Sequence, residues 1–151
     1  MGQGEHTLAS NRRARFDYEI EDRFEAGIVL TGAEVKSLRA GQVSLNESYA
    51  RVSGGQVWLE NMHVARYEQS KIKQDERRPR KLLLHRREID RLVGKTAEQG
   101  LTLVPMRIYL SHGLIKVELG LGKGKRRHEK RASIAERESK REMERELGRR
   151  R

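Results

Sequence analysis

The apolar and polar positions of this chain alternate through much of its first 121 residues, which predicts strands more often than helices. Near the N-terminus, Phe16, Tyr18 and Ile20 alternate with acidic residues, and the apolar residues 28–30 continue the run. An alternation of period two places one face of an extended chain against a core. We therefore expect one long first strand over residues 16–30, bent at Gly27.

Turn residues predict two hairpins. Strand-like runs at residues 48–52 and 56–64 flank Ser53, Gly54 and Gly55, and the glycines supply the positive φ that a tight turn needs. A second hairpin turns at residues 111–113. Its first strand has Val104, Met106, Ile108 and Leu110 on one face, and its return strand has Ile115, Val117, Leu119 and Leu121 on one face. Pro105 cannot donate to a ladder, so we expect an edge or a bulge there.

Two amphipathic segments predict short helices. One covers residues 33–40 and is capped by Gly41, and the other covers residues 85–93 and ends at Gly94. Residues 96–100 are compatible with a further turn, and the polar residues 66–81 are expected to form a loop. About six strands with two or three helices indicate a small closed or nearly closed antiparallel barrel, because closure leaves no strand edge unpaired.

Length and composition fit one globular domain with a basic tail. The 151 residues are 35% hydrophobic, 36% charged and 5% aromatic, so a large apolar ligand cavity is not expected. The chain has no cysteine, which excludes disulfides and thiolate chemistry and favours a reducing compartment. Without a signal-peptide pattern or an apolar run of membrane-spanning length, we expect a cytoplasmic protein with no membrane segment.

Positive charge is concentrated at the C-terminus. Between Lys123 and Arg151 there are thirteen Lys or Arg and six Glu, which places +7 of the net charge of +11 there. Phosphates neutralise such charge and release counterions on contact, so the tail is typical of a nucleic-acid-binding arm. The alternative is a solvated tail that serves solubility alone.

Patterns typical of catalysis are weak. The five histidines are scattered, with no pair at the helical spacing that would hold one metal. Gly120, Gly122 and Gly124 follow a strand, but basic residues come next where a dinucleotide-binding helix would need apolar ones. No serine has the setting of a hydrolase nucleophile. We therefore expect no enzyme activity, no metal and no cofactor.

Four segments, in order, resemble the small protein B family, the tmRNA-binding proteins of bacterial trans-translation. They are residues 27–41 (GIVLTGAEVKSLRAG), 78–92 (RPRKLLLHRREIDRL), 100–109 (GLTLVPMRIY) and 116–131 (KVELGLGKGKRRHEKR). The resemblance runs from about Asn11 into the tail. It implies a six-stranded antiparallel, oligonucleotide-binding-like barrel over residues 11–122, with about three short helices, and a tail over residues 123–151 that is disordered in the free protein.

The resemblance also implies a function and its partners. The family escorts alanyl-tmRNA into ribosomes that are stalled without an intact downstream mRNA. The expected partners are tmRNA and the ribosome, namely small-subunit rRNA, the decoding centre and the mRNA channel. Elongation factor Tu and alanyl-tRNA synthetase would be reached indirectly through alanyl-tmRNA, and the protein would be a monomer.

Residue types and resemblance together predict an RNA-binding set. It comprises Glu34, Lys36, Arg39, Asn46, Asn61, Arg78, Arg80, Lys81, Lys123, Gly124 and Lys125. Because a carboxylate cannot attract phosphate, Glu34 is expected either to accept hydrogen bonds from base edges or to hold a neighbouring arginine, the alternative being a surface ion pair. The asparagines could equally form turns, the basic residues 78–81 could be solvated loop charge, and Gly124 could be a hinge or a point of close RNA approach.

A second predicted set lies in the tail and contacts the ribosome. It comprises His128, Glu129, Lys130, Arg131, Ile134, Met143 and Leu147. Glu129 stands where most family members have Asp, and the His128 ring could stack on an rRNA base. Favourable and unfavourable i,i+4 charge pairs roughly cancel along this tail, so we expect a helix that orders only on a phosphate-lined surface. Such a tail could test whether the mRNA channel is empty.

Two other functions remain open at this level. The chain could be a ribosomal or RNA-chaperone protein that binds rRNA constitutively, or, less in keeping with its residues, a nucleic-acid-processing enzyme. Tail truncation separates an escort from a constitutive ribosomal protein, because an escort keeps tmRNA binding and loses rescue, whereas the ribosomal protein loses ribosome affinity.

Overall fold

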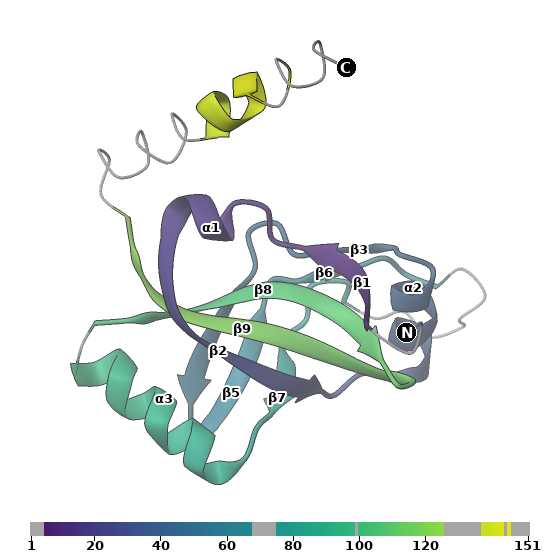
Figure 1. The fold of residues 1–151 in the computed structure, drawn as a ribbon. Coiled ribbons are helices and arrows are strands. Elements are labelled where there is room, and N and C mark those ends of the chain that lie inside the picture. The colour runs from purple at the N-terminus through teal and green to yellow at the C-terminus, as the bar shows by residue number, and fades with distance from the viewer. Residues whose placement is uncertain (1–4, 68–74, 99, 126–136, 144, 146–151) are drawn as a thin grey trace.

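The computed structural model describes residues 5–67, 75–98, 100–125, 137–143 and 145 (Figure 1). Its strands are β1 (Glu5–Ser10), β2 (Tyr18–Ile28), β3 (Val43–Ser44), β4 (Tyr49–Ser53), β5 (Gln56–Glu60), β6 (His63–Val64), β7 (Arg80–Leu83), β8 (Thr102–Ser111) and β9 (Leu114–Gly124). Its helices in the body are α1 (Ala14–Asp17), α2 (Gly32–Arg39) and α3 (Arg86–Glu98). The protein is mainly β, as expected.

The strands form one large antiparallel sheet and one small one. The order of the large sheet is β1-β8-β9-β2-β7-β5-β4, and β3 pairs with β6 in the second sheet. β1 and β4 are the two edges, so this sheet is not closed by hydrogen bonds, although β4 also contacts β8 and the sheet is therefore strongly curved. The closed or nearly closed barrel that was expected is therefore not closed, and the described residues form nine strands, seven of them in the large sheet, where about six were expected.

Both predicted hairpins are confirmed. Gly54 and Gly55, with φ of 60° and 74°, join β4 to β5, and His112 and Gly113, with φ of 50° and 79°, join β8 to β9. Positive φ at both central residues matches the right-handed twist of the flanking strands. The predicted run over residues 56–64 is split into β5 and β6, because Asn61, with φ of 63°, breaks the extended backbone.

A bulge in β8 changes which residues share a face. The register with β9 shifts between Pro105 and Arg107, which confirms the irregularity expected at the proline. Val104 and Met106 pack with Ala14 of α1, whereas Ile108 belongs to the main core. The prediction that all three lie on one face is wrong, because one extra residue in a strand reverses the alternation.

Several elements differ from the sequence expectation. β1 pairs with β8, and β7 begins at Arg80, inside the segment 66–81 that was expected to be a loop, and continues to Leu83. Residues 14–17 form one helical turn before β2, so the first strand starts two residues later than predicted. Gly94 does not end α3, which continues to Glu98 with the Thr96 hydroxyl donating to the Leu92 carbonyl at 2.8 Å. No helix within the described ranges is long and apolar enough to cross a membrane.

Candidate nucleic-acid interface

Helix α2 presents the first group of predicted site residues. Thr31 caps its N-terminus, since the Thr31 hydroxyl accepts from the Glu34 backbone N–H at 3.2 Å and the Glu34 carboxylate accepts from the Thr31 N–H at 2.9 Å. This reciprocal pair satisfies two amides that the first turn would leave open. Gly41, with φ of 75°, follows the helix as predicted. The cap fixes the position of the Glu34 side chain.

Glu34 is buried and binds two arginines. Only 4% of Glu34 is exposed, and Arg80 is 0% exposed. Arg80 Nε lies 2.7 Å and Nη2 2.6 Å from Glu34 Oε2, and the Arg78 guanidinium pairs with the same carboxylate. Arg80 also donates to the Met62 carbonyl at 2.7 Å. Glu34 therefore holds neighbouring arginines, which was one of the two roles expected, and its ion pair is not on the surface.

The charges in this cluster stabilise each other. Burial raises the pKa of Glu34, but hydrogen bonds from Arg78, the Thr31 backbone and Arg80 outweigh that effect, so the pKa of Glu34 lies below its ordinary value of 4.5. Burial also lowers the pKa of Arg80, against the opposing effect of Glu34. An arginine remains protonated in either case. The cluster is a fixed anion between two fixed cations.

Arg80 does not lie on the protein surface. The expectation that it extends an electropositive face is therefore wrong for direct phosphate contact, because its guanidinium is satisfied by Glu34 and by backbone carbonyls. Arg78 differs, since 29% of its side chain is exposed and can meet a ligand from outside. Lys81 is half-buried on β7, opposite Trp58 of β5.

Exposed cations surround this cluster. Lys36 and Arg39 are exposed on α2, and the Lys36 ammonium lies 5.0 Å from the centre of the Tyr67 ring. Nearby, His63 Nε2 lies 2.7 Å from Glu76 Oε2. The hydrogen bond with His63 and that from the Arg66 backbone lower the pKa of Glu76. Arg66, Tyr67 and Arg77 were not among the predicted site residues, although Arg77 belongs to the basic run around Pro79.

The two predicted asparagines are parts of turns. Asn61 Nδ2 donates to the Glu47 carbonyl at 3.3 Å, and both residues have positive φ. Arg77 in turn donates to the Asn61 carbonyl at 3.3 Å. Asn46 is exposed in the turn before β4. The alternative expectation of a turn former therefore describes Asn61, while Asn46 presents its side chain outward.

A second basic group lies far from α2. Lys123 and Gly124 are exposed at the end of β9, and the Lys125 backbone N–H donates to the Asp17 carbonyl at 2.8 Å. Figure 1 shows this end of β9 beside α1, on the side of the molecule opposite α2. β9 includes two residues that were assigned to the tail. The predicted RNA-binding set is thus divided between two ends of the fold.

Only part of the predicted tail site can be placed. Residues 137–143 are helical and exposed, and Met143 is 65% exposed. The Arg137 guanidinium lies 5.8 Å from the centre of the Phe16 ring in α1. The other predicted tail contacts lie outside the described residues: His128, Glu129, Lys130, Arg131, Ile134 and Leu147. Within the described ranges, no group of three or more acidic or histidine side chains could hold a metal.

A family model described as "SmpB protein" matches residues 8–149 of this chain. The chain belongs to the SmpB family. It is therefore an RNA-binding adaptor and not an enzyme. An "SsrA-binding protein" from Thermobifida fusca (strain YX) is 58% identical over 151 residues, covering 99% of this chain and 94% of that protein. Another from Acidothermus cellulolyticus is 57% identical over 148 residues, covering 97% of this chain and 93% of that protein.

A solved structure is similar as well. Its chain, described under "tmRNA-SmpB: a journey to the center of the bacterial ribosome", is 52% identical to this one, with a TM-score of 0.65. The match covers 83% of this chain and 92% of the solved chain. This chain is therefore similar to that SmpB chain in fold as well as in sequence.

Proposed function

We propose that this chain binds the tRNA-like part of tmRNA and delivers it to stalled ribosomes for trans-translation. The observation that carries the proposal is the similarity along nearly the whole chain to SsrA-binding proteins and to a solved chain described with tmRNA and the ribosome. The chemistry of the fold is in keeping with it, because exposed cations lie at both ends of a curved sheet. Phosphate neutralisation by such cations supplies most sequence-independent RNA affinity.

In this proposal the α2 end contacts tmRNA. Arg78 offers a partly exposed guanidinium that Glu34 holds at a fixed angle, and Lys36 and Arg39 lie on the same helix as Glu34. A preorganised guanidinium loses less freedom on binding phosphate than a free side chain does. The curved sheet would serve as an open counterpart of an oligonucleotide-binding-like barrel, with no chemistry catalysed by the chain.

The β9 end and the tail would face the ribosome. β9 ends on the side of the molecule that carries α1, away from α2, so one end of the fold can hold tmRNA while the tail tests an empty mRNA channel. Elongation factor Tu and alanyl-tRNA synthetase would be engaged only through alanyl-tmRNA. We further propose that the chain acts as a monomer in the cytoplasm.

Binding and tagging assays test the proposal. The full chain should bind a tmRNA transcript at least tenfold more tightly than the same transcript without its tRNA-like part, and it should support peptide tagging on a truncated message. Equal affinity for an rRNA fragment, together with loss of ribosome binding on tail removal, would favour a constitutive ribosomal protein and contradict the proposal.

A further inference from the structure

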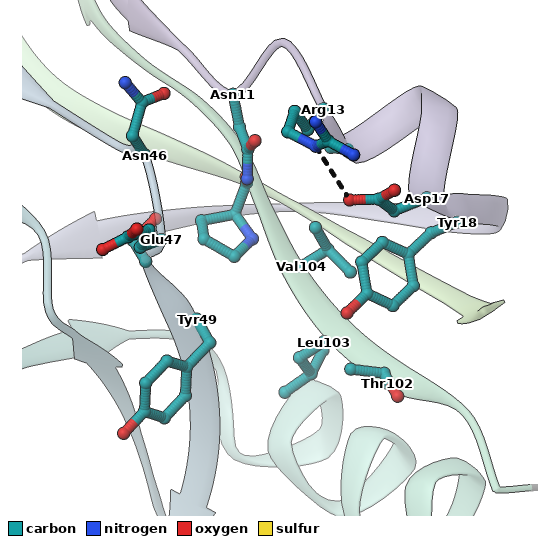
Figure 2. Close-up of a pocket in the computed structure, with 13 residues that line it drawn as sticks. Asn11, Arg13, Asp17, Tyr18, Asn46, Glu47, Tyr49, Thr102, Leu103 and Val104 are labelled. Atoms are coloured by element: carbon teal, nitrogen blue, oxygen red, sulfur yellow. Dashed lines mark hydrogen bonds and ion pairs between the residues drawn. The ribbon is translucent and has the colours of Figure 1, made fainter.

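A pocket opens between α1, the turn before β4 and the start of β8 (Figure 2). Its volume is about 590 Å³, within the usual range of roughly 300–1,000 Å³ for small-ligand sites. Apart from Asn46, none of its lining residues belongs to the predicted RNA-binding set. The pocket is therefore a feature that neither the α2 cluster nor the tail explains.

Aromatic and apolar side chains form its walls. Tyr18, from the start of β2, and Tyr49, from the start of β4, stand on opposite sides of the opening (Figure 2). Tyr49 is 51% exposed, although a large aromatic ring is usually more deeply buried. Val104 and Pro105 of β8 line the pocket between them. An exposed tyrosine such as Tyr49, beside an apolar surface, is suited to stacking on a planar ring.

Polar groups at one side are held in place by the fold. Glu47 has φ of 66°, a conformation uncommon outside glycine, and Asn61 fixes it by donating to its carbonyl at 3.3 Å. Asn11 donates through Nδ2 to the Pro105 carbonyl at 3.0 Å, which fixes the opposite side. The side-chain amide of Asn46 and the Tyr18 hydroxyl make no hydrogen bond within the described ranges. A carboxylate and an amide beside an aromatic wall can read the edge of a base.

Cations beside the pocket would receive a phosphate. Arg12, Arg13 and Arg15 are exposed on and before α1, and Arg13 lies 3.4 Å from Asp17 (Figure 2). A neighbouring hollow of about 420 Å³ shares Asn11 with the pocket and includes Arg12 and Arg15 in its lining, beside Arg107, which pairs with Glu5 and Glu118. Among ligands with a planar ring, this charge favours a nucleotide over an apolar peptide side chain.

We propose that this pocket binds one unpaired RNA nucleobase bearing an exocyclic amino group. The ring stacks on Tyr49, the amino group donates to the Glu47 carboxylate, and the adjoining phosphate meets the arginines on and before α1. The inference rests on the proposed function only in taking RNA as the partner, since it concerns a different surface from the α2 cluster. It predicts discrimination between bases, which a purely electrostatic surface cannot provide.

Short single-stranded RNAs test the pocket directly. The full chain is titrated with fluorescently labelled pentacytidylate, pentauridylate and an abasic ribose-phosphate pentamer. Cytosine and uracil have similar rings but differ in an amino donor against a carbonyl acceptor. Pentacytidylate should bind most tightly and the abasic pentamer most weakly. Equal affinity for all three would overturn the proposal and leave the arginines as a nonspecific surface.

Matched variants locate the effect. Tyr49→Ala should weaken pentacytidylate binding about tenfold, whereas Tyr49→Phe, which keeps the ring, should not. Glu47→Gln should remove the preference for cytosine over uracil, because an amide can also donate. A Tyr49→Ala variant that melts like wild type and binds pentacytidylate equally well would overturn the proposal. Failure of the proposed function would appear separately, as loss of the preference for tmRNA over an rRNA fragment in the wild-type chain.

Discussion

Among single side chains, Glu34 is the one whose loss should affect stability most. Its carboxylate is the only anion paired with the buried Arg80 among the described residues. Replacing it by Gln leaves a buried guanidinium without its counterion. Glu34→Gln should therefore lower the free energy of unfolding by about 3 kcal/mol, measured by urea denaturation.

Arg78→Gln is the matched control for that variant. It removes the partly exposed partner and leaves the Glu34–Arg80 pair intact, so its cost should stay below about 1 kcal/mol. If Arg78→Gln weakens tmRNA binding as much as Glu34→Gln does, then Glu34 acts through Arg78. A Glu34→Gln protein as stable as wild type would contradict the buried ion pair.

The lowered pKa of Glu34 gives a pH dependence with a definite sign. A carboxyl whose pKa is lower in the folded state contributes its full stabilisation above its unfolded value, ordinarily 4.5, and loses it as pH falls through the folded value. Wild-type stability should therefore decrease on acidification below about pH 4.5, with a shallower decrease in Glu34→Gln. Parallel curves for the two proteins, from urea denaturation between pH 3 and 7, would contradict this assignment.

At the scale of elements, the glycines of β9 determine how closely β2 approaches it. A Cβ on Gly122 would lie 2.2 Å from the Glu19 carbonyl oxygen, whereas a Cβ on Gly124 would meet nothing within 4 Å. Gly122→Ala should destabilise the fold by about 2 kcal/mol or more, because backbone atoms cannot yield as side chains do. Gly124→Ala should change stability by less than about 0.5 kcal/mol. Thermal melts compare the two, and equal melting temperatures would contradict the close approach.

The Gly124→Ala variant also tests whether RNA approaches the end of β9. Since Gly124→Ala leaves the fold unchanged, any loss of RNA affinity in that variant reports close approach of RNA to the end of β9. Unchanged affinity would contradict a close approach of RNA to Gly124.

At the scale of the whole molecule, the described tail helix adds little to the body. Residues 137–143 are exposed throughout, and this includes Arg137, which contacts the Phe16 ring. Deleting residues 132–151 should change the free energy of unfolding by less than about 0.5 kcal/mol and leave tmRNA affinity nearly intact. Peptide tagging on a truncated message should nevertheless be lost.

A second tail variant separates shape from charge. Polar replacement of Ile134, Met143 and Leu147 keeps the net charge and removes the apolar anchors that a docked helix would use. Tagging should fall if the tail works as an ordered helix. Normal tagging by the protein that lacks residues 132–151 would instead indicate that the tail serves solubility alone.

Local chemistry was sufficient for much of the fold. Gly54, Gly55 and Gly113 are residues that tolerate positive φ, so each predicted hairpin turn could be read from the sequence. The helical period and Gly41 likewise defined α2, and the T-x-x-E signature from Thr31 to Glu34 would have located its cap. Family membership could also be predicted from the order of the motifs, because a family resemblance depends on residue identity alone.

Other features depended on contacts between distant segments. β1 and β7 are short runs without a clear alternation of apolar and polar residues, and they become strands because β8, β2 and β5 offer hydrogen-bonding partners. The bulge at Pro105 sent Val104 and Met106 toward α1 and Ile108 toward the main core, which reversed a face that the alternation had predicted. Strand pairing and register are decided by the partner strand as well as by the residue.

The burial of Arg80 shows most clearly the difference between what local chemistry determines and what contacts between distant segments determine. By its own chemistry an arginine in a basic segment belongs on the surface, and the sequence therefore placed it in an RNA-binding face. The fold instead brings Glu34 of α2 and the Met62 carbonyl to its guanidinium, from 46 and 18 residues away. The sequence determined the local turns, helices and overall charge of this protein. Tertiary structure alone decided which charges are buried, because the desolvation of a charge can be offset only by partners that folding brings together.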